Sequence, residues 1–203
     1  MSKRLMSIVA AMVSLAACEG EPPQRDPAGT ALKVQLLERL RADQAVRDSV
    51  FGRGLQMDGP AVASMLRVDS ANTTWLKAEI VRNGWPSPTR VGAAASNAAF
   101  LIVQHATHDP PFQRAMLDTI ALAFEKGEIE GQSYALLFDR VRTQAGEKQR
   151  YGTQAKLKGN RVVFDPIEDS LKVDSLRATV KLSTLADYRR VLDSVYFGKA
   201  AKQ

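Results

Sequence analysis

Gln104 and His105 lie near the end of the most apolar segment that follows residue 18, and His105 is the residue best suited to acid or base chemistry. Imidazole titrates close to neutral pH, and a buried position can tune that titration. Asp109 lies four residues further on and could orient the ring, so His105 and Asp109 are the candidate catalytic residues. Two alternatives remain open: His105 can be a hydrogen-bonded structural residue, and Asp109 can cap a helix that begins at Pro110.

Residues suited to ligand binding follow later in the chain. Arg140 could bind a carboxylate or a phosphate through two parallel hydrogen bonds, or it could pair with Glu128 or Asp169. Residues 149–154, with the sequence QRYGTQ, place six groups that suit recognition in six positions. The candidate ligand-binding residues are Gln104, Arg140, Tyr151, Thr153 and Gln154.

A metal or nucleotide centre is not expected. A metal site would need His105, His108 and Asp109 with a distant carboxylate such as Glu128 or Asp139, and this spacing matches no familiar ligand motif. The sequence contains only two histidines, and it has no Gly-x-Ser-x-Gly elbow, phosphate-binding loop or dinucleotide fingerprint. We therefore predict no metal and no cofactor.

The element that positions these groups is the segment 91–109, VGAAASNAAFLIVQHATHD. Apolar residues point in nearly every direction around it, which is typical of a helix buried at the centre of a fold. At 100° per residue, Asn97, Gln104 and His108 fall within about 20° of one line. The pattern predicts a polar seam on a central helix, and a pocket is expected there.

The remaining pattern is mainly helical. Apolar periodicity predicts helices at 31–51, about 60–82, 110–126 and 131–145, a helical turn around 174–178, and a closing helix through Leu185, Tyr188, Leu192 and Val195. The fold class is mainly α (α+β), with five or six helices around a buried central helix and one β-hairpin near residues 151–164.

The hairpin is predicted from its turn and its alternation. Gly159-Asn160 suits a two-residue turn, and closing the hairpin there opposes Leu157 to Val162 and Ala155 to Phe164. Counting back along the strand, Tyr151 and Thr153 share the inward face. Gln154 lies on the other face unless a bulge or an early strand end reverses the alternation.

The first thirty residues indicate an envelope location. Residues 1–17 have a basic start and a short apolar run, as a secretory signal peptide does, and Leu15-Ala16-Ala17-Cys18 resembles a lipobox. Cys18 would then carry acyl chains such as palmitate, and residues 18–30, rich in proline and charge, read as a flexible tether. The domain is residues 31–203. The alternative is an ordinary signal peptide containing a cysteine.

The predicted partners follow from location and charge. The chain has 28 Lys and Arg against 22 Asp and Glu, a formal net charge of +6 that is too dispersed to indicate nucleic-acid binding. We expect a protein held on the bacterial membrane surface by its lipid anchor. Glu19, where an aspartate would retain a lipoprotein in the inner membrane, favours the outer membrane. The domain either binds a small polar ligand, with possible hydrolytic or transfer chemistry, or is a structural or interaction module for another envelope protein.

Several short motifs occur together in a fixed order between about residues 75 and 192. They are Gly84-Trp85-Pro86, Gln104-His105-Ala106 with Asp109, Phe112 and Gln113, Gly127-Glu128, Asp139-Arg140, the stretch 149–154, Pro166-Ile167-Glu168-Asp169, Val173-Asp174 and Tyr188-Arg189. This combination resembles a bacterial family known only as a domain of unknown function, of the family 6624 type, often found in secreted or lipid-anchored proteins. The resemblance marks candidate positions and implies no activity.

Overall fold

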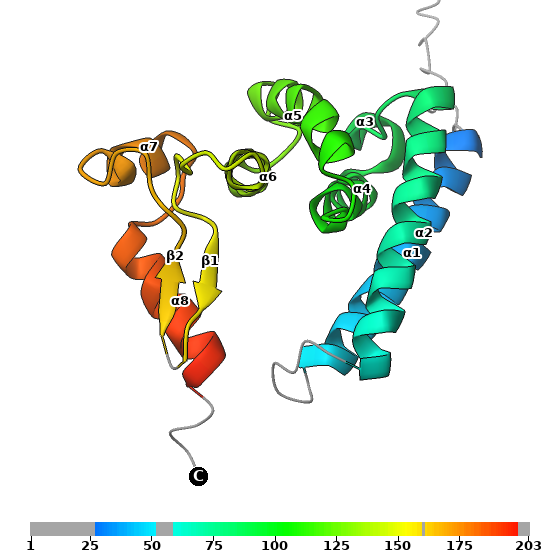
Figure 1. Ribbon diagram of the computed structural model, residues 1–203. Coiled ribbons are helices and arrows are strands. Elements are labelled where there is room, and N and C mark those ends of the chain that lie inside the picture. Colours follow the sequence, from blue (N-terminus) through cyan, green and yellow to red (C-terminus); the bar gives the residue numbers. More distant parts are fainter. Residues whose placement is uncertain (1–26, 52–58, 160, 199–203) are drawn as a thin grey trace, which may run out of the picture.

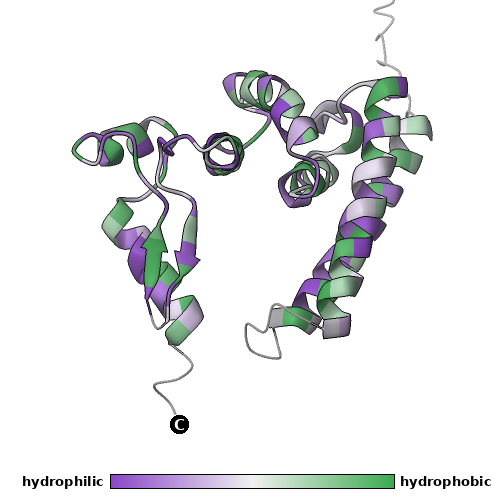
Figure 2. Ribbon diagram, in the orientation of Figure 1, coloured by the Kyte–Doolittle hydropathy of each residue, from purple (hydrophilic) through white to green (hydrophobic). Residues whose placement is uncertain are grey.

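Two long antiparallel helices form one side of the molecule in the computed structural model, which describes residues 27–51, 59–159 and 161–198 (Figure 1). They are α1 (Pro27–Phe51) and α2 (Gly59–Asn83). Hydrophilic and hydrophobic residues alternate along both (Figure 2), as expected for helices with one buried face. The prediction of these two helices is confirmed, except that α1 begins inside the segment predicted as a tether.

The centre of the fold is α4 (Ala93–His105), which follows the short helix α3 (Pro88–Val91). Ala95, Ala98 and Ala99 are fully buried in α4, and these small side chains allow close packing against α1, α2, α5 and α6. The predicted buried central helix is confirmed. The predicted polar seam is wrong: Asn97 is exposed, and His108 lies beyond the end of the helix and is also exposed, so only Gln104 of the three is buried.

Helices α5 (Pro110–Glu125) and α6 (Gly131–Gln144) pack against each other and continue the core. Asp109 begins α5 as its N-cap, because its side chain accepts a hydrogen bond from the backbone N–H of Phe112. Ile120 of α5 and Leu137 of α6 are fully buried in the core cluster that surrounds α4. Helix α6 thus lies between the helical core and the C-terminal part of the chain (Figure 1).

The C-terminal part contains the hairpin of β1 (Ala155–Leu157) and β2 (Val162–Phe164), followed by α7 (Val173–Thr179) and α8 (Leu185–Phe197). The strands pair in the predicted antiparallel register, with Ala155 opposite Phe164 and Leu157 opposite Val162. The described part of the chain has six long helices, two short ones and this two-stranded sheet. The predicted class, mainly α with one hairpin, is confirmed.

The predicted signal peptide, Cys18 and most of the tether lie outside the described residues. Within the described ranges, no helix is both long and apolar enough to cross a bilayer.

Candidate functional site

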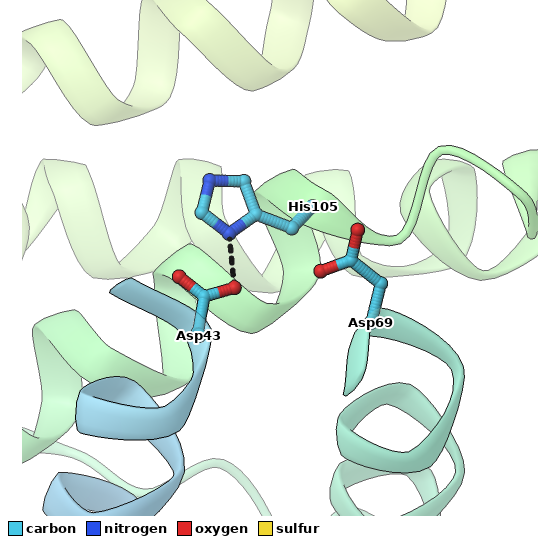
Figure 3. Close-up of side chains that lie close together, drawn as sticks. All are labelled: Asp43, Asp69 and His105. Carbon is cyan, nitrogen blue, oxygen red and sulfur yellow. Dashed lines mark hydrogen bonds and ion pairs between the residues drawn. The ribbon is translucent and has the colours of Figure 1, made fainter. Parts of the chain in front are cut away.

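His105 closes the last turn of α4 and faces α1. Its Nδ1 atom lies 2.9 Å from Oδ1 of Asp43, and its side chain is 20% exposed while that of Asp43 is 3% exposed. The second ring nitrogen, Nε2, points away from both Asp43 and Asp69 (Figure 3) and makes no hydrogen bond with the described residues. The imidazole is therefore held at one nitrogen and open at the other.

Arg47, one turn after Asp43 on α1, ties the cluster together. Its Nη2 lies 3.1 Å from Oδ1 of Asp43 and 2.6 Å from Oδ1 of Asp69, a residue of α2. Its Nε lies 3.2 Å from Nδ1 of His105 and 3.3 Å from Oδ2 of Asp43. Helices α1, α2 and α4 each contribute charge or imidazole to one centre.

These contacts decide the tautomer of His105. A carboxylate only accepts hydrogen bonds, so the close approach to Asp43 requires a proton on Nδ1. Nδ1 then cannot accept from Arg47, whose Nε donates instead to the same carboxylate. Neutral His105 therefore carries its lone pair on Nε2, the nitrogen without a protein partner, which is the arrangement of a general base.

The two carboxyl groups are tuned in opposite directions. Burial alone raises the pKa of Asp43, but hydrogen bonding to His105 and the charges of His105 and Arg47 outweigh it and hold that pKa below its ordinary value. Burial raises the pKa of Asp69 above its ordinary value, with Arg47 only partly offsetting the effect. Asp43 is the firmly ionised partner of His105, and Asp69 is the carboxyl that accepts a proton more readily.

Asp43, Asp69 and His105 also have the donor atoms for a metal ion, and one ligand atom from each lies within 4.8 Å of the others. Oxygen and imidazole donors suit a first-row divalent cation. However, the guanidinium of Arg47 already contacts both carboxylates, so a cation would have to displace it. The arrangement fits an ion-pair network around a histidine better than a metal centre.

Asp109 does not orient His105. Besides capping α5, its carboxylate pairs with Lys77 of α2 at 2.7 Å. The hydrogen bond from Phe112 and the ion pair with Lys77 hold the Asp109 side chain at the partly exposed start of α5. The residue that occupies the orienting position is Asp43, and Asp109 is explained by the capping alternative.

Arg140 of α6 comes to the same end of α4. Its Nη1 donates to the backbone carbonyl of Gln104 at 2.7 Å, and its Nε donates to Oε1 of Gln154 at 3.3 Å. It pairs with neither Glu128 nor Asp169, and burial, followed by the positive charge of Arg47, lowers its pKa. Gln104 contributes its carbonyl, whereas its buried side-chain Oε1 has no hydrogen-bond partner in the described structure.

Tyr151 and Thr153 do not face the end of α4. They face α6, because the fully buried carboxylate of Asp139 accepts hydrogen bonds from three backbone N–H groups, those of Arg150, Tyr151 and Thr153, and from the Thr153 hydroxyl. Burial raises the pKa of Tyr151 to about 12, so its phenol stays neutral at physiological pH. Both residues organise the loop, and the Thr153 hydroxyl, which lines the pocket beside Arg140, is already bonded to Asp139 and Gln154.

Gln154 is the residue of this loop that reaches Arg140. Strand β1 begins only at Ala155, so residues 149–154 follow the hydrogen bonds of Asp139 and of the buried Gln149 rather than strict alternation. Tyr151 and Thr153 are buried, as their predicted inward face requires, but they pack against α6, and Gln154 is the residue that reaches the end of α4 through Arg140. The QRYGTQ stretch divides into structural residues and one that positions an arginine.

The sequence comparison places this arrangement in a family. Residues 30–201 match the model of the family of unknown function DUF6624. The chain belongs to this family. The resemblance inferred from the motifs between residues 75 and 192 is thus confirmed, and the family match extends further toward the N-terminus to include most of α1 and all of α2. No curated protein and no solved structure matches the chain.

Sequence reasoning missed Asp43, Arg47 and Asp69, three members of the candidate site. A signal was present in the spacing. Asp43 lies seven residues from both Leu36 and Val50, two buried core residues of α1, so it occupies a position on the apolar stripe. A charged residue on such a stripe needs a partner, and Arg47 stands one turn away.

Proposed function

We propose that the protein is a lipid-anchored lipoprotein of the bacterial envelope whose helical domain binds a small polar ligand and acts on it by acid–base chemistry at His105. The observation that carries this proposal is the pair formed by Asp43 and His105, with Nε2 of the imidazole open. The lipobox-like sequence at Cys18 supports the anchor.

The chemistry would be hydrolytic or group transfer. Nε2 takes a proton from a water molecule or a ligand hydroxyl as that oxygen attacks an electrophilic carbonyl or phosphoryl centre, and the resulting imidazolium returns the proton to the leaving group. Asp43 stabilises the imidazolium, and Arg47 holds Asp43 in place. Arg140, fixed on the carbonyl next to His105, supplies a positive charge at this end of α4.

The experiment is a conversion screen. The full chain, purified from membranes in detergent, is incubated with cell-wall fragments, nucleotides and small phosphoesters, and products are identified by mass spectrometry. We expect conversion of at least one class, abolished in His105→Ala and retained in His108→Ala, a matched control because His108 is exposed. Conversion that persists in His105→Ala, or no conversion of any class, would contradict an acid–base role.

A second candidate, a non-enzymatic interaction lipoprotein, is favoured by a different observation. Helix α8 contains no fully buried residue, and Val191 and Val195 on it are 56% and 64% exposed. Exposed apolar side chains in a group are typical of a protein–protein contact. If this candidate is right, Val191→Asp combined with Val195→Asp abolishes co-purification of an envelope protein while His105→Ala leaves it intact.

A further inference from the structure

A pocket of about 200 Å³ lies between α6, the β-hairpin and α8. This is about the volume that six or seven water molecules occupy in the liquid. The pocket is lined by the charged Arg140, the phenol of Tyr188, and the apolar side chains Leu136, Leu157, Val162 and Leu192. His105 is not part of the lining, although Arg140 bonds to the carbonyl of the preceding residue.

Arg140 enters this pocket with its guanidinium already oriented. Nε is held by the Gln154 amide oxygen and Nη1 by the Gln104 carbonyl, whereas Nη2 makes no hydrogen bond to any residue that the structure describes. Gln154 is itself fixed, since its Nε2 donates to the Thr153 hydroxyl at 3.0 Å. A donor held in one orientation before binding loses little freedom when a ligand arrives.

The charge of Arg140 has no carboxylate beside it within the described ranges. Its two partners are neutral oxygens, in contrast to Arg47, which contacts two carboxylates. A mostly buried guanidinium is costly when neutral groups alone solvate it, and the nearby charge of Arg47 adds to the cost. Lys156, also in the lining, already pairs with Asp165. The uncompensated charge in the pocket is that of Arg140.

We propose that this pocket binds a small anion, a carboxylate or a phosphate carrying a short apolar group, with the anionic oxygens on Nη2 of Arg140 and the apolar group against Leu136, Leu157, Val162 and Leu192. The inference names the ligand class for the function proposed above. The inference rests on the proposed function only in one respect, namely that the ligand bound in this pocket is the one on which His105 acts. Binding of the anion does not require His105.

Calorimetric titration of the full chain in detergent tests the class. The probes are butyrate and butyl phosphate, with acetate and inorganic phosphate as head groups alone, and butanol and butylammonium as uncharged and cationic controls. We expect butyrate to bind more tightly than acetate, butyl phosphate to bind more tightly than inorganic phosphate, and butanol and butylammonium not to bind. The tighter of butyrate and butyl phosphate identifies the preferred head group. Equal binding of butanol, or no binding of any anion, would overturn the proposal.

Variants locate the site. Arg140→Met should weaken the binding of butyrate and butyl phosphate roughly tenfold to a hundredfold, the range for a lost charge-assisted hydrogen bond. Arg142→Met, two positions later on the same helix, removes an arginine that pairs with Glu147 instead and should leave binding unchanged. If Arg140→Met does not fold, Arg140→Lys keeps the charge but not the fixed geometry, and it should still weaken binding. Equal effects at positions 140 and 142 would refute the assignment.

His105→Ala separates this inference from the proposed function. This variant should bind butyrate and butyl phosphate as the wild type does, because His105 does not line the pocket. Anion binding through Arg140 without conversion of any ligand would mean that the proposed function fails and the pocket assignment stands. If conversion needs His105 but no anion binds at Arg140, the proposed function stands and the pocket assignment fails.

Discussion

Nδ1 of His105 and Oδ1 of Asp43 lie 2.9 Å apart although the residues are 62 positions apart in the chain. The contact joins the end of the central helix α4 to the middle of α1. Asp43 is buried and paired with Arg47, so its carboxylate is fixed in position. The hydrogen bond from His105 to this carboxylate therefore fixes the imidazole as well. Such support fixes the orientation of an imidazole that is to act on a ligand.

Replacing Asp43 with asparagine should change how stability depends on pH. The pKa of Asp43 in the folded protein lies below its ordinary value, so the unfolded chain binds a proton there more readily. Its contribution is fully present above the ordinary carboxyl pKa of about 4 and is lost as pH falls through the lower folded value. Urea denaturation between pH 7 and pH 2.5 should show a shallower acid loss in Asp43→Asn than in the wild type. Asp118→Asn, at an exposed position, is the control; a slope unchanged in Asp43→Asn would contradict the ion pair.

Replacing Asp139 with alanine should destabilise the fold strongly. The carboxylate is fully buried and accepts from three backbone N–H groups, which would lose their partner together. Buried donors left without an acceptor make a loss of about 3–5 kcal/mol in the free energy of unfolding the expected result. Urea denaturation measures it, with Asp118→Ala expected to change stability by less than about 0.5 kcal/mol. A small effect at Asp139 would mean that water replaces the carboxylate.

The local features were predictable from the sequence because each depends on neighbouring residues. The hairpin register follows from a turn at 159–160 and from alternation over a few positions, and the capping role of Asp109 follows from the proline after it. The predicted polar seam failed at His108 because the segment does not remain helical past His105, and it failed at Asn97 because that position of α4 is exposed. Helical projection is valid only up to the residue at which the helix ends.

The site itself was only partly predictable, because it is assembled by tertiary packing. Asp43 and Asp69 meet His105 only when α1, α2 and α4 pack together; spacing places Asp43 on the buried stripe of α1 but does not identify its partners on other helices. Arg140 was identified by its chemistry, but its partners were not, since one is a backbone carbonyl. The inward face of Tyr151 was predictable from strand alternation, but its position against α6 was not, because it depends on the carboxylate of Asp139, twelve residues earlier.

Replacing Cys18 with serine should release the protein from membranes. A lipid anchor acts through the acyl chains on the cysteine, and serine has no thiol to carry them. Fractionation of cells expressing wild type and Cys18→Ser, with immunoblotting of membrane and soluble fractions, measures the effect. Ser14→Ala, four residues before the cysteine, is the control and should remain in the membrane fraction. Equal membrane retention of Cys18→Ser and wild type would defeat the lipoprotein proposal.

Replacing Gly152 with alanine should lower the free energy of unfolding more than the same change at Gly146. The comparison separates the effect of close packing, present only at Gly152, from the backbone strain that both positions share. Both glycines have positive φ, 67° and 76°, so alanine costs about 1–2 kcal/mol at either position. At Gly152 the new Cβ would also lie 2.8 Å from Cδ1 of Leu185, whereas at Gly146 it would meet no atom within 4 Å. We expect Gly152→Ala to lose a further 1–3 kcal/mol, roughly the cost of overpacking. Urea denaturation of both variants measures the difference; equal losses would show that Leu185 moves aside and that the 149–154 loop is not packed tightly against the start of α8.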